Sequence, residues 1–572
     1  MKARWKISPC PPALSEELCR RLDVPPVVAQ LLIKRGITDY QDGERFLSPS
    51  LQHLHDPLLM KDMNKGTERV IRALEKGEKI TIYGDYDVDG ISACALLVDF
   101  LGSLGNQAAY YIPHRLQEGY GLNAEAVKRI AAEGTKLLIC VDCGISDGEE
   151  IQLAQALGMD TIVVDHHEPP PLPSPAYAVL DPLQADCPFP FKGLAGVGVA
   201  FYLVIALRSR LREKGFWRDG AEPNLNRYLD LVALGTIADI VPLMDINRVL
   251  VTYGLRELRE TPRPGLRALK EVSGIGGEEI STGHVGFRLA PRLNAGGRLA
   301  DAQVGVELLL TKDHEQARRI AEALDQANRE RQQIEERIYQ EAKEIIERGG
   351  LFNRRSIILS SDHWHPGVIG IVASRIVEEF RRPTILIAME GDMGKGSARS
   401  IVGFHLYQGL QECAGLLVGF GGHKYAAGLT IRRDNVQAFR DGFEEVAKRN
   451  LGEEDLIPTI SVDAELDPEE ITPELLRHIS GFAPYGPTNP KPLFATRNRF
   501  QPHDVRVVGK NTLKFRLRWE KRTYEVIGFG MGDLSSELSS ELKIAFYPQM
   551  NDWQGVRRLQ LELKAVETGN EG

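Results

Sequence analysis

The sequence has few cysteines and no long apolar run. Its 572 residues include seven cysteines, an odd number scattered along the chain, which excludes the paired framework of a small disulfide-rich secreted protein. The longest apolar run, Val199 to Leu207, has nine residues, whereas a membrane-spanning helix needs about 20. The first residues, MKARWKISPCPPALSEEL, contain no apolar stretch of the kind found in signal peptides. We therefore expect a protein of the reducing cytoplasm, without membrane association.

The chain also lacks an excess of positive charge. It has 70 Lys and Arg against 79 Asp and Glu, a formal net charge of -9. Over the whole chain, that balance argues against nucleic-acid binding, which depends on cations that neutralise phosphates. At about 150 residues per domain, however, the length predicts several domains, so the charge has to be examined region by region.

Two regions alternate short apolar strands with helices. In the first, the pattern predicts strands and helices in turn at 79–83, 91–104, 137–141, 147–157 and 161–164. In the second, from Ser356 to about Asn450, the strand-like runs IILS and TILIA precede a Gly-rich stretch from Gly419 to Gly428. Apolar strands separated by helices favour α/β domains with largely parallel, buried sheets.

Between these regions, Gln316 to Arg348 contains no Gly or Pro. Apolar residues recur in it at the spacing of one helical face, at Ile320, Leu324, Ala327, Ile334, Ile338, Ala342 and Ile345. An uninterrupted helix of this length would extend about 50 Å and would end at Gly349. It could be a core helix of one domain; we favour a connection between two domains, because its other faces are heavily charged.

The last part of the chain differs in pattern and charge. Nine acidic residues and no Lys or Arg lie between Leu451 and Glu474, which indicates a boundary. Short alternating runs follow, such as LKFRLRW and YEVIGF, typical of a small antiparallel barrel or sandwich. Ten Lys or Arg and two acids lie between Lys491 and Arg522. A solvated sheet face is one explanation; a basic OB-fold that binds single strands through a charged groove is another, with Trp519, placed on the cationic face, as a stacking residue.

Acidic and histidine side chains follow three successive strands of the first region. They are Asp85, Asp87 and Asp89 after 79–83, Asp142 after 137–141, and Asp165, His166 and His167 after 161–164. The carboxyl ends of strands in an open α/β sheet line one ligand-binding crevice. A further acid, Asp239, lies in the apolar run LVALGTIADIVPL, where an unpaired carboxylate would be costly to bury.

Crowded carboxylates repel one another unless cations neutralise them. Carboxylates with one or two imidazoles and no thiolate suit Mg²⁺ or Mn²⁺, and two such ions about 3.5–4 Å apart form a hydrolytic phosphoryl site. The alternative is that these aspartates cap helix N-termini at βα turns. That would explain one Asp, but three consecutive strand ends and a His pair favour the metal site.

Two other motifs are weaker. DYDVDG begins like a calcium-binding loop, but it follows a strand, and its twelfth position is Leu96 where a Glu is required. Cys140 and Cys143 have the spacing of a redox motif, but Cys140 lies inside an apolar strand. We interpret Cys140 as a core residue and reject a redox role for the pair.

Four motifs, GDYDVDG, VDCGIS, VVDHHEP and GTIADIVPL, resemble those of the DHH phosphoesterase superfamily, and GSARS with GGHKYAAGLTI resembles its DHHA1 substrate-binding domain. With HRLQEGYGL, RLAPRLNAGGRL and APYGPTNPKPLF, the similarity extends over most of the chain to the RecJ family of bacterial single-strand-specific 5′→3′ exonucleases. The resemblance implies two α/β domains joined by a long helix and followed by a small OB-like β-barrel. The expected parts are an N-terminal segment (1–50), DHH catalytic domain (51–265), connecting region with the long helix (266–350), DHHA1 domain (351–452) and OB-like nucleic-acid-binding domain (453–572).

The resemblance also implies the ligands of two divalent cations, Mn²⁺ or Mg²⁺: Asp85, Asp87, Asp89, Asp142, His166 and Asp239. Asp87 and Asp89 would bind different cations, which Asp142 would bridge. His166 and Asp239 would complete the ligands of the cation bound by Asp89, and Asp85 would support the other cation. Many family members carry a ligating His four residues before the Asp87 position, where this chain has Tyr83.

The implied catalytic residues are Asp142 and His167, the latter in contact with the scissile phosphate. Strand-end recognition needs cations as well. Arg115 follows a strand-like run, Arg292 and Arg298 lie in a predicted Gly-containing loop, and Lys395 precedes two alternating polar residues whose side chains and amides could face an anion. The resemblance implies a 5′-phosphate pocket formed by Arg115, Arg298, Ser397 and Arg399. It also implies a further contact with substrate, made by His423.

We therefore predict a two-metal phosphodiesterase that degrades single-stranded DNA 5′→3′, releases 5′-mononucleotides and serves DNA recombination and repair. A helicase and a single-strand-binding protein are expected partners. One alternative is a small-substrate DHH phosphoesterase for oligoribonucleotides or cyclic dinucleotides, which the basic β-rich region disfavours. Another is a non-catalytic DNA-binding scaffold, which the presence of the metal-site acids disfavours.

Overall fold

The computed structural model describes residues 4–7, 9–115, 118–217, 222–276, 279–299, 301–519, 522–538, 541–553 and 556–568. The chain forms two compact units. One comprises Met1–Leu54, Pro242–Thr252 and Pro458–Gly572, and the other His55–Val241 and Tyr253–Ile457. Within the described ranges, none of the helices is long and apolar enough to cross a membrane.

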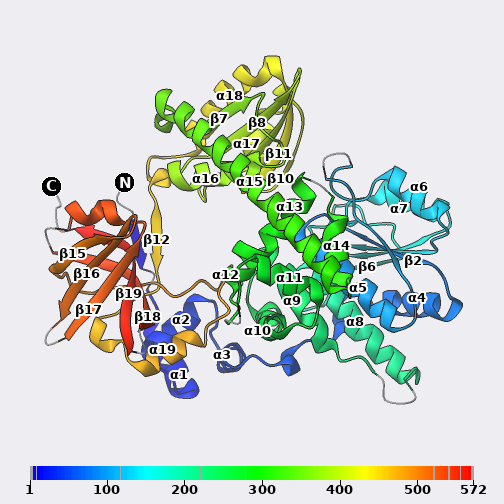
Figure 1. The fold of residues 1–572 in the computed structure, drawn as a ribbon, viewed down its shortest axis with the longest axis horizontal. Helices are drawn as coiled ribbons and strands as arrows, with labels where there is room; N and C mark the ends of the chain where they lie inside the picture. Colours follow the sequence, from blue (N-terminus) through cyan, green and yellow to red (C-terminus); the bar gives the residue numbers. More distant parts are fainter. Residues whose placement is uncertain are drawn as a thin grey trace. The chain divides into compact units, whose positions relative to one another are not determined.

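A five-stranded parallel sheet organises the first α/β part of the larger unit (Figure 1). In the sheet order β3-β2-β4-β5-β6, its strands are β3 (Ala109–Tyr111), β2 (Ile80–Gly84), β4 (Leu137–Val141), β5 (Asp160–Val164) and β6 (Ala178–Leu180). One face is covered by α6 (Ala124–Ala132) and α7 (Gly148–Ala156), and the other by α4 (Met63–Lys76), α5 (Val88–Ser103) and α8 (Gly196–Glu213). The predicted strands are confirmed, and β3 and β6 are additional.

The strand order reverses between β2 and β4. From β2 the chain leads to β3 on one side of the sheet, and it then returns to place β4 on the other side. Ligands of open α/β sheets bind outside the carboxyl ends of the strands at such a switch point. The predicted acids that follow β2 and β4 therefore stand where this topology favours a site.

The second α/β part has a mixed sheet in the order β10-β11-β9-β8-β7. Its strands are β7 (Ile357–Ser361), β8 (Thr384–Glu390), β9 (Met393–Arg399), β10 (Leu417–Gly422) and β11 (Ala426–Arg432). Strands β7 and β8 are parallel, and the other pairings are antiparallel. Helix α16 (Ile369–Phe380) packs on one face, and α17 (Leu406–Glu412) with α18 (Val436–Asn450) on the other. The Gly-rich stretch forms the β10–β11 hairpin.

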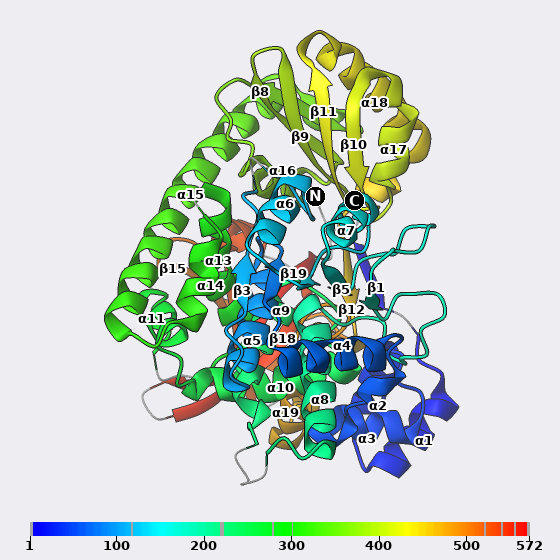
Figure 2. The same cartoon turned by 90° about the vertical axis from the view of Figure 1, so that its right-hand side faces the viewer.

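The helices between these parts are α9 (Leu229–Ala238), α10 (Asp245–Glu260), α11 (Pro264–Val272), α12 (Thr282–His284), α13 (Ala290–Leu299), α14 (Gln303–Leu310) and α15 (His314–Arg348), with the π-helix η4 (Val285–Leu289) before α13. Helix α15 packs on α11, α13 and α14, and its last third contributes Ile338, Ala342 and Ile346 to the core of the second sheet (Figure 2). The predicted connection of two α/β parts by a long helix is confirmed. Ile345, expected on the buried face, is exposed, because the stripe advances from Ala342 by four residues to Ile346.

The smaller unit joins segments that are far apart in the sequence. Its seven-stranded sheet, in the order β13-β14-β18-β19-β17-β16-β15, comprises β13 (Ala464–Glu465), β14 (Phe494–Ala495), β15 (Pro502–Val508), β16 (Thr512–Trp519), β17 (Arg522–Phe529), β18 (Leu542–Trp553) and β19 (Val556–Thr568). Helices α1 (Pro12–Leu22), α2 (Pro26–Lys34), α3 (Tyr40–Leu47) and α19 (Pro473–Ser480) share one hydrophobic core with it. Strand β1 (Arg4–Ile7) pairs with β12 (Thr459–Val462).

The expectation of purely antiparallel pairing is wrong in this sheet. Strands β13 and β14 are parallel, and so are β17 and β19. The second pairing arises because β18 lies on the far side of β19 from β17. Strand β19 then lies between β18 and β17. It runs antiparallel to β18 and parallel to β17.

Strand β16 alternates as predicted, but Trp519 lies on the opposite face from the one expected. Arg516 and Arg518 are exposed, and the apolar side chains between and before them are buried. Trp519 shares the parity of the buried positions, since side chains alternate along a strand. Its ring packs edge-on against Phe500 at 4.9 Å between centroids, and its indole N–H donates to Glu469 at 3.1 Å. Residues 520 and 521 of the cation-rich segment lie outside the described residues.

Candidate metal centre and strand-end pocket

The acids after β2 lie in the turn that begins α5. Asp87 caps this helix: its Oδ1 accepts hydrogen bonds from the amides of Asp89 at 2.9 Å and Gly90 at 3.2 Å. The helix-capping alternative therefore applies to Asp87, which nevertheless also belongs to the acidic cluster. A Cβ at Gly90 would lie 2.6 Å from backbone atoms of Asp85, so the tight turn requires glycine.

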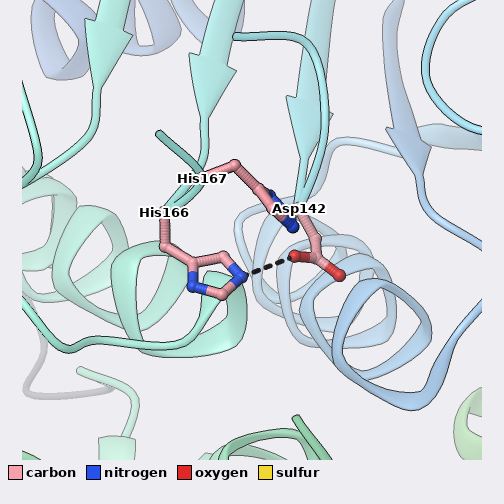
Figure 3. A group of neighbouring side chains, drawn as sticks. All are labelled: Asp142, His166 and His167. Carbon is pink, nitrogen blue, oxygen red and sulfur yellow. Dashed lines mark hydrogen bonds and ion pairs between the residues drawn. The ribbon is translucent and has the colours of Figure 1, made fainter. Parts of the chain in front are cut away.

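The six predicted metal ligands come together in overlapping groups whose ligand atoms lie within 4.8 Å of one another. These groups are Asp89, His166 and Asp239; Asp85, Asp87 and Asp142; and Asp142, His166 and His167. Nε2 of His166 lies 3.1 Å from Asp142, 3.5 Å from Asp239 and 3.9 Å from Asp89. Figure 3 shows the His166 ring turned toward the Asp142 carboxylate at the strand ends. Asp89, His166 and Asp239 thus form one group and Asp85, Asp87 and Asp142 another, and Asp142 also lies beside the two histidines.

Backbone amides hold the Asp89 carboxylate, and the backbone of Asp142 adopts an uncommon conformation. The amides of Gly196 and Val197, at the start of α8, donate to Asp89 at 2.6 and 3.0 Å. Asp142 has a left-handed backbone with φ 60°, a conformation in which Asp is enriched. A Cβ at Gly196 would lie 2.9 Å from the Asp142 Cβ, and one at Gly235 of α9 would lie 2.6 Å from Asp89 Oδ1. Helices α8 and α9 therefore need glycine to pack directly on the carboxylates.

Burial, followed by repulsion between neighbouring carboxylates, raises the pKa of four carboxyls. The pKa is about 7 for Asp89 and about 9 for Asp239, and it lies well above the ordinary value for Asp85 and Asp142. Among the described residues, Asp85 Oδ1 and Asp239 Oδ2 are buried without a hydrogen-bond partner. Unpartnered carboxylate oxygens with one imidazole are the donors that Mg²⁺ and Mn²⁺ bind. These residues therefore fit a pair of divalent cations, whose charge would remove the repulsion.

His167 is held by a different set of partners. Its Nδ1 lies 2.7 Å from Oδ1 of the fully buried Asp165 and 3.2 Å from the hydroxyl of Tyr120, which donates to the carbonyl of Asp142. Burial lowers the pKa of His167, but the hydrogen bond and charge of Asp165 outweigh it and raise the pKa to about 9. Burial and the neighbouring His167 lower the pKa of His166 to about 4. The neutral imidazole suits a metal ligand, and the cationic one suits a donor to phosphate.

Tyr83 does not reach the site. At the position where many family members carry a histidine, its side chain is fully buried, and its hydroxyl donates to the carbonyl of Gly121 at 3.0 Å. The group on that side instead contains Asp85. Cys140 is buried, as predicted, and Cys143 is buried as well; burial raises the pKa of both thiols, which disfavours the reactive thiolate.

A pocket of about 210 Å³ lies within the same compact unit. Its lining residues are Arg115, Arg298, Pro366, Gly367, Gly370, Ile371, Ser374, Ser397 and Arg399. Arg298 Nη1 donates to the carbonyl of Gly367 at 2.8 Å, and Arg399 Nη1 donates to Ser397 Oγ at 3.2 Å. Burial, followed by the repulsion of Arg115, lowers the pKa of Arg298 to about 10. Arginines that repel one another in a pocket favour the binding of an anion, and the four predicted phosphate-binding residues all line this pocket.

Other details predicted for strand-end recognition are wrong. Arg292 and Arg298 lie on helix α13 instead of in a loop. The neighbouring Gly297 serves close packing, since a Cβ there would lie 2.9 Å from the carbonyl oxygen of Tyr86. Arg292 forms an ion pair with Asp325 at 2.8 Å and is absent from the pocket lining.

The GSARS segment forms β9, which pairs with β8 on one side and β11 on the other. Its amides are therefore used in the sheet, and only the side chains of Ser397 and Arg399 face the pocket. Lys395 is exposed and does not line it. His423 is exposed at the β10–β11 turn, where its amide donates to the carbonyl of Ala426 at 2.8 Å, and it too is absent from the pocket lining.

The motifs in the sequence give no specific role to Asp165, Tyr120, Gly370 or Ser374. Asp165 lies at the same strand end as the two histidines, and this position in the sequence indicates that it could orient one of them. Gly370 and Ser374 are four residues apart on α16, and residues at that spacing share a helical face. No local pattern distinguishes Tyr120 from other exposed tyrosines.

Comparison with known proteins gives three family matches: the DHH family N-terminal domain at residues 79–236, the DHHA1 domain at 353–449 and the RecJ OB domain at 462–565. The single-stranded-DNA-specific exonuclease RecJ of Bacillus subtilis (strain 168) is 40% identical over 569 residues, 98% of this chain and 70% of the relative. That of Escherichia coli (strain K12) is 38% identical over 554 residues, 95% and 93% of the two chains. Crystal structures of RecJ from Thermus thermophilus match with Mn²⁺ (TM-score 0.85, 32% identity, 99% and 80% of the chains) and with Mg²⁺ (0.78, 31%, 99% and 79%).

Proposed function

Because the chain belongs to the RecJ family of single-stranded-DNA-specific exonucleases, we propose that it degrades single-stranded DNA from the 5′ end and releases 5′-mononucleotides. It is a hydrolytic nuclease that uses divalent cations, as its relatives and their Mn²⁺ and Mg²⁺ complexes support. The observation that carries the 5′→3′ polarity is the arginine pocket in the same compact unit as the cation site. We also propose that the chain divides into domains at the limits predicted from the sequence: 1–50, 51–265, 266–350, 351–452 and 453–572.

The cation site is assigned to six residues. One cation would be held by Asp89, His166 and Asp239, and the other by Asp85 and Asp87, with Asp142 between them. When bound, such a pair supplies Lewis-acid stabilisation of the charge that develops on a transferring phosphoryl group. The helix amides on Asp89 and the left-handed backbone of Asp142 keep the carboxylates oriented before substrate arrives.

His167 is the proposed proton donor to the scissile phosphate. Asp165 fixes its Nδ1–H, so the other nitrogen, Nε2, is the one available to a phosphoryl oxygen or to the leaving 3′ oxygen. The hydroxyl of Tyr120 lies 3.2 Å from Nδ1 and 3.5 Å from Nε2 of this ring and limits its rotation. A histidine held in this way stabilises the negative charge of the transition state without reorganisation.

The strand end is assigned to the arginine pocket, where Arg115, Arg298, Ser397 and Arg399 would hold a 5′-phosphate, and His423 would contact the strand elsewhere. A terminal phosphate has one more negative charge and one more free oxygen than an internal phosphodiester, so clustered arginines favour it. Hydrolysis that leaves the 5′-phosphate on the shortened strand would regenerate the group that the pocket binds.

The smaller unit is proposed to hold the strand behind its end. A groove of about 430 Å³ along β15, β16 and β17 is lined by three cations, Arg506, Lys514 and Arg516, and by the acids Asp504, which pairs with Arg516, and Glu525. The excess of cations supports backbone binding through phosphates. A role in DNA recombination and repair, supply of the strand by a helicase and a single-strand-binding protein, and a cytoplasmic location all belong to this proposal. The match to the RecJ OB domain and the complete set of acids disfavour the small-substrate and scaffold alternatives.

One assay tests these points together. The protein and its Asp142→Ala variant are incubated with Mn²⁺ and 3′-labelled single-stranded DNA, duplex DNA or short oligoribonucleotides. We expect progressive release of mononucleotides from the 5′ end of the single strand, and none from the variant. Degradation from the 3′ end would refute the polarity, cleavage confined to di- and trinucleotides would favour the small-substrate alternative, and an active variant would refute the metal-site assignment.

A further inference from the structure

Two large apolar side chains are exposed near the candidate metal centre. Ile240 directly follows Asp239 and is 72% exposed. Phe287 is 85% exposed, the largest fraction among the large apolar side chains that the structure describes. Single exposed apolar residues are common on protein surfaces, so the backbone at each position has to show whether these two are special.

Ile240 has a strained backbone conformation that burial of its side chain does not offset. Its φ is 62°, in the left-handed region, where a β-branched residue is a genuine outlier. Glycine would adopt this backbone without a clash between Cβ and the neighbouring carbonyl. With most of its side chain in solvent, Ile240 gains little burial in return for this strain. Backbone strain of this kind clusters at functional sites, and the adjacent residue is a proposed metal ligand.

Phe287 is carried by an unusual helical segment. It lies in the π-helix η4, and π-helical turns are rare and frequently occur at functional sites. The segment packs on the last turn of α9: a Cβ at Gly286 would lie 3.9 Å from Cγ2 of Ile237. Ile237 precedes Ile240 by three residues, and Asp239 lies between them. The segment that carries the exposed Phe287 side chain therefore packs against the end of α9 next to the metal ligand.

We propose that Ile240 and Phe287 form an apolar contact for the nucleobases next to the scissile phosphate. The proposal rests on the proposed function and adds the recognition of bases to that of phosphates by the arginine pocket and the carboxylates. Stacking on an aromatic ring suits an enzyme that has to accept successive different bases, because every base has a π face. A protein partner bound on Ile240 would cover the neighbouring Asp239, so continuity with the metal centre favours substrate as the occupant.

The test compares two 5′-phosphorylated single strands that differ only in their first four nucleotides, which are intact in one and abasic in the other. Degradation rates are measured with Mn²⁺ for the wild type, Phe287→Ala, Ile240→Gly and the control Phe352→Ala, which removes a phenylalanine that is 43% exposed in the second α/β part. Since stacking contributes about 1–3 kcal/mol per base, the wild type should prefer the intact strand by roughly 5- to 150-fold.

Phe287→Ala and Ile240→Gly should each reduce this preference at least fivefold by slowing degradation of the intact strand, with little change on the abasic strand. Ile240→Gly should also keep or raise the melting temperature, and Phe352→Ala should behave as the wild type. An unchanged preference in both variants, or an equal loss on both strands, would overturn the proposal. Should Ile240→Gly misfold, Phe287→Ala decides alone. A wild type that degrades neither strand would instead overturn the proposed function itself.

Discussion

The glycine at position 370 offers a sharp test of the strand-end pocket. Gly370 is the second residue of α16 and has no left-handed backbone, so alanine is compatible with its conformation and improves helix propensity by about 1 kcal/mol. A Cβ there, however, would lie 2.8 Å from Ser397 Oγ and 3.1 Å from Arg399 Nη2. Both atoms are ends of side chains that can rotate away. Gly370→Ala should therefore leave the fold intact and displace two groups from the pocket.

The cost can be stated for a particular substrate. A hydrogen bond to a charged group contributes about 1.5–3 kcal/mol, so loss of the Arg399 contact with a 5′-phosphate should lower kcat/KM roughly 10- to 150-fold. Strands with a 5′-hydroxyl cannot use this contact and should lose little. The measurement is kcat/KM with Mn²⁺ on oligonucleotides that differ only in their 5′ group.

Gly442→Ala is a matched control, because this glycine lies in α18 and a Cβ there would be 3.9 Å from its nearest neighbours. The control should retain the wild-type preference for 5′-phosphate, and both variants should melt at or above the wild-type temperature. If Gly370→Ala folds and keeps the preference within threefold, this pocket does not bind the 5′-phosphate. The polarity would then need another structural origin.

Three further expectations concern the acids, the smaller unit and its cations. Asp142→Asn should abolish Mn²⁺-dependent activity yet raise the melting temperature in EDTA, because it removes a buried carboxylate whose pKa is raised by burial and by its neighbours; a lowered melting temperature would contradict this. Arg248→Met should lower the free energy of unfolding by about 3 kcal/mol or more in urea titrations, because the buried Arg248 side chain donates to the carbonyls of Phe46, Gly481 and Phe482; a change below 1 kcal/mol would refute that role. Arg518→Gln should reduce the salt slope of single-strand binding by about 0.7, whereas Arg348→Gln, on the exposed face of α15, should not.

The first sheet and its acids were predictable because each signal is local. A strand, its turn and the acid that follows occupy ten or so consecutive residues, and the parallel topology then brings successive turns to one edge. The error at Trp519 has the opposite character. The sequence predicts the alternation of β16. The face on which a side chain lies, however, depends on whether it is an even or an odd number of residues from a buried neighbour, so a count that is wrong by one residue places it on the wrong face.

No local sequence pattern predicts which segments of the chain form the smaller unit. Residues such as Leu31 and Phe46 read as parts of ordinary amphipathic helices, and nothing near them in the sequence indicates that they share a core with Phe515 and Phe546. The pairing joins segments more than 400 residues apart, so it follows from complementary surfaces that only the folded chain brings together. For this reason Arg518→Gln tests the terminal sheet better than deletion of that region, which would expose the buried faces of α1 to α3.

The two errors at the strand-end pocket share one cause, which concerns glycine. The glycines in PRLNAGGRL predict a loop that approaches phosphate, and the small residues around Ser397 predict amides that are free to face an anion, yet the two segments are a helix and a strand. Gly297 permits α13 to pack against a carbonyl oxygen in the metal-site turn, and Gly235 similarly permits α9 to pack against Asp89. Neither has a positive φ, so neither is needed for backbone freedom. In this protein a glycine within a helix near the site marks a place where the helix approaches a functional group too closely for a Cβ, and Gly370 fits the same rule at the arginine pocket.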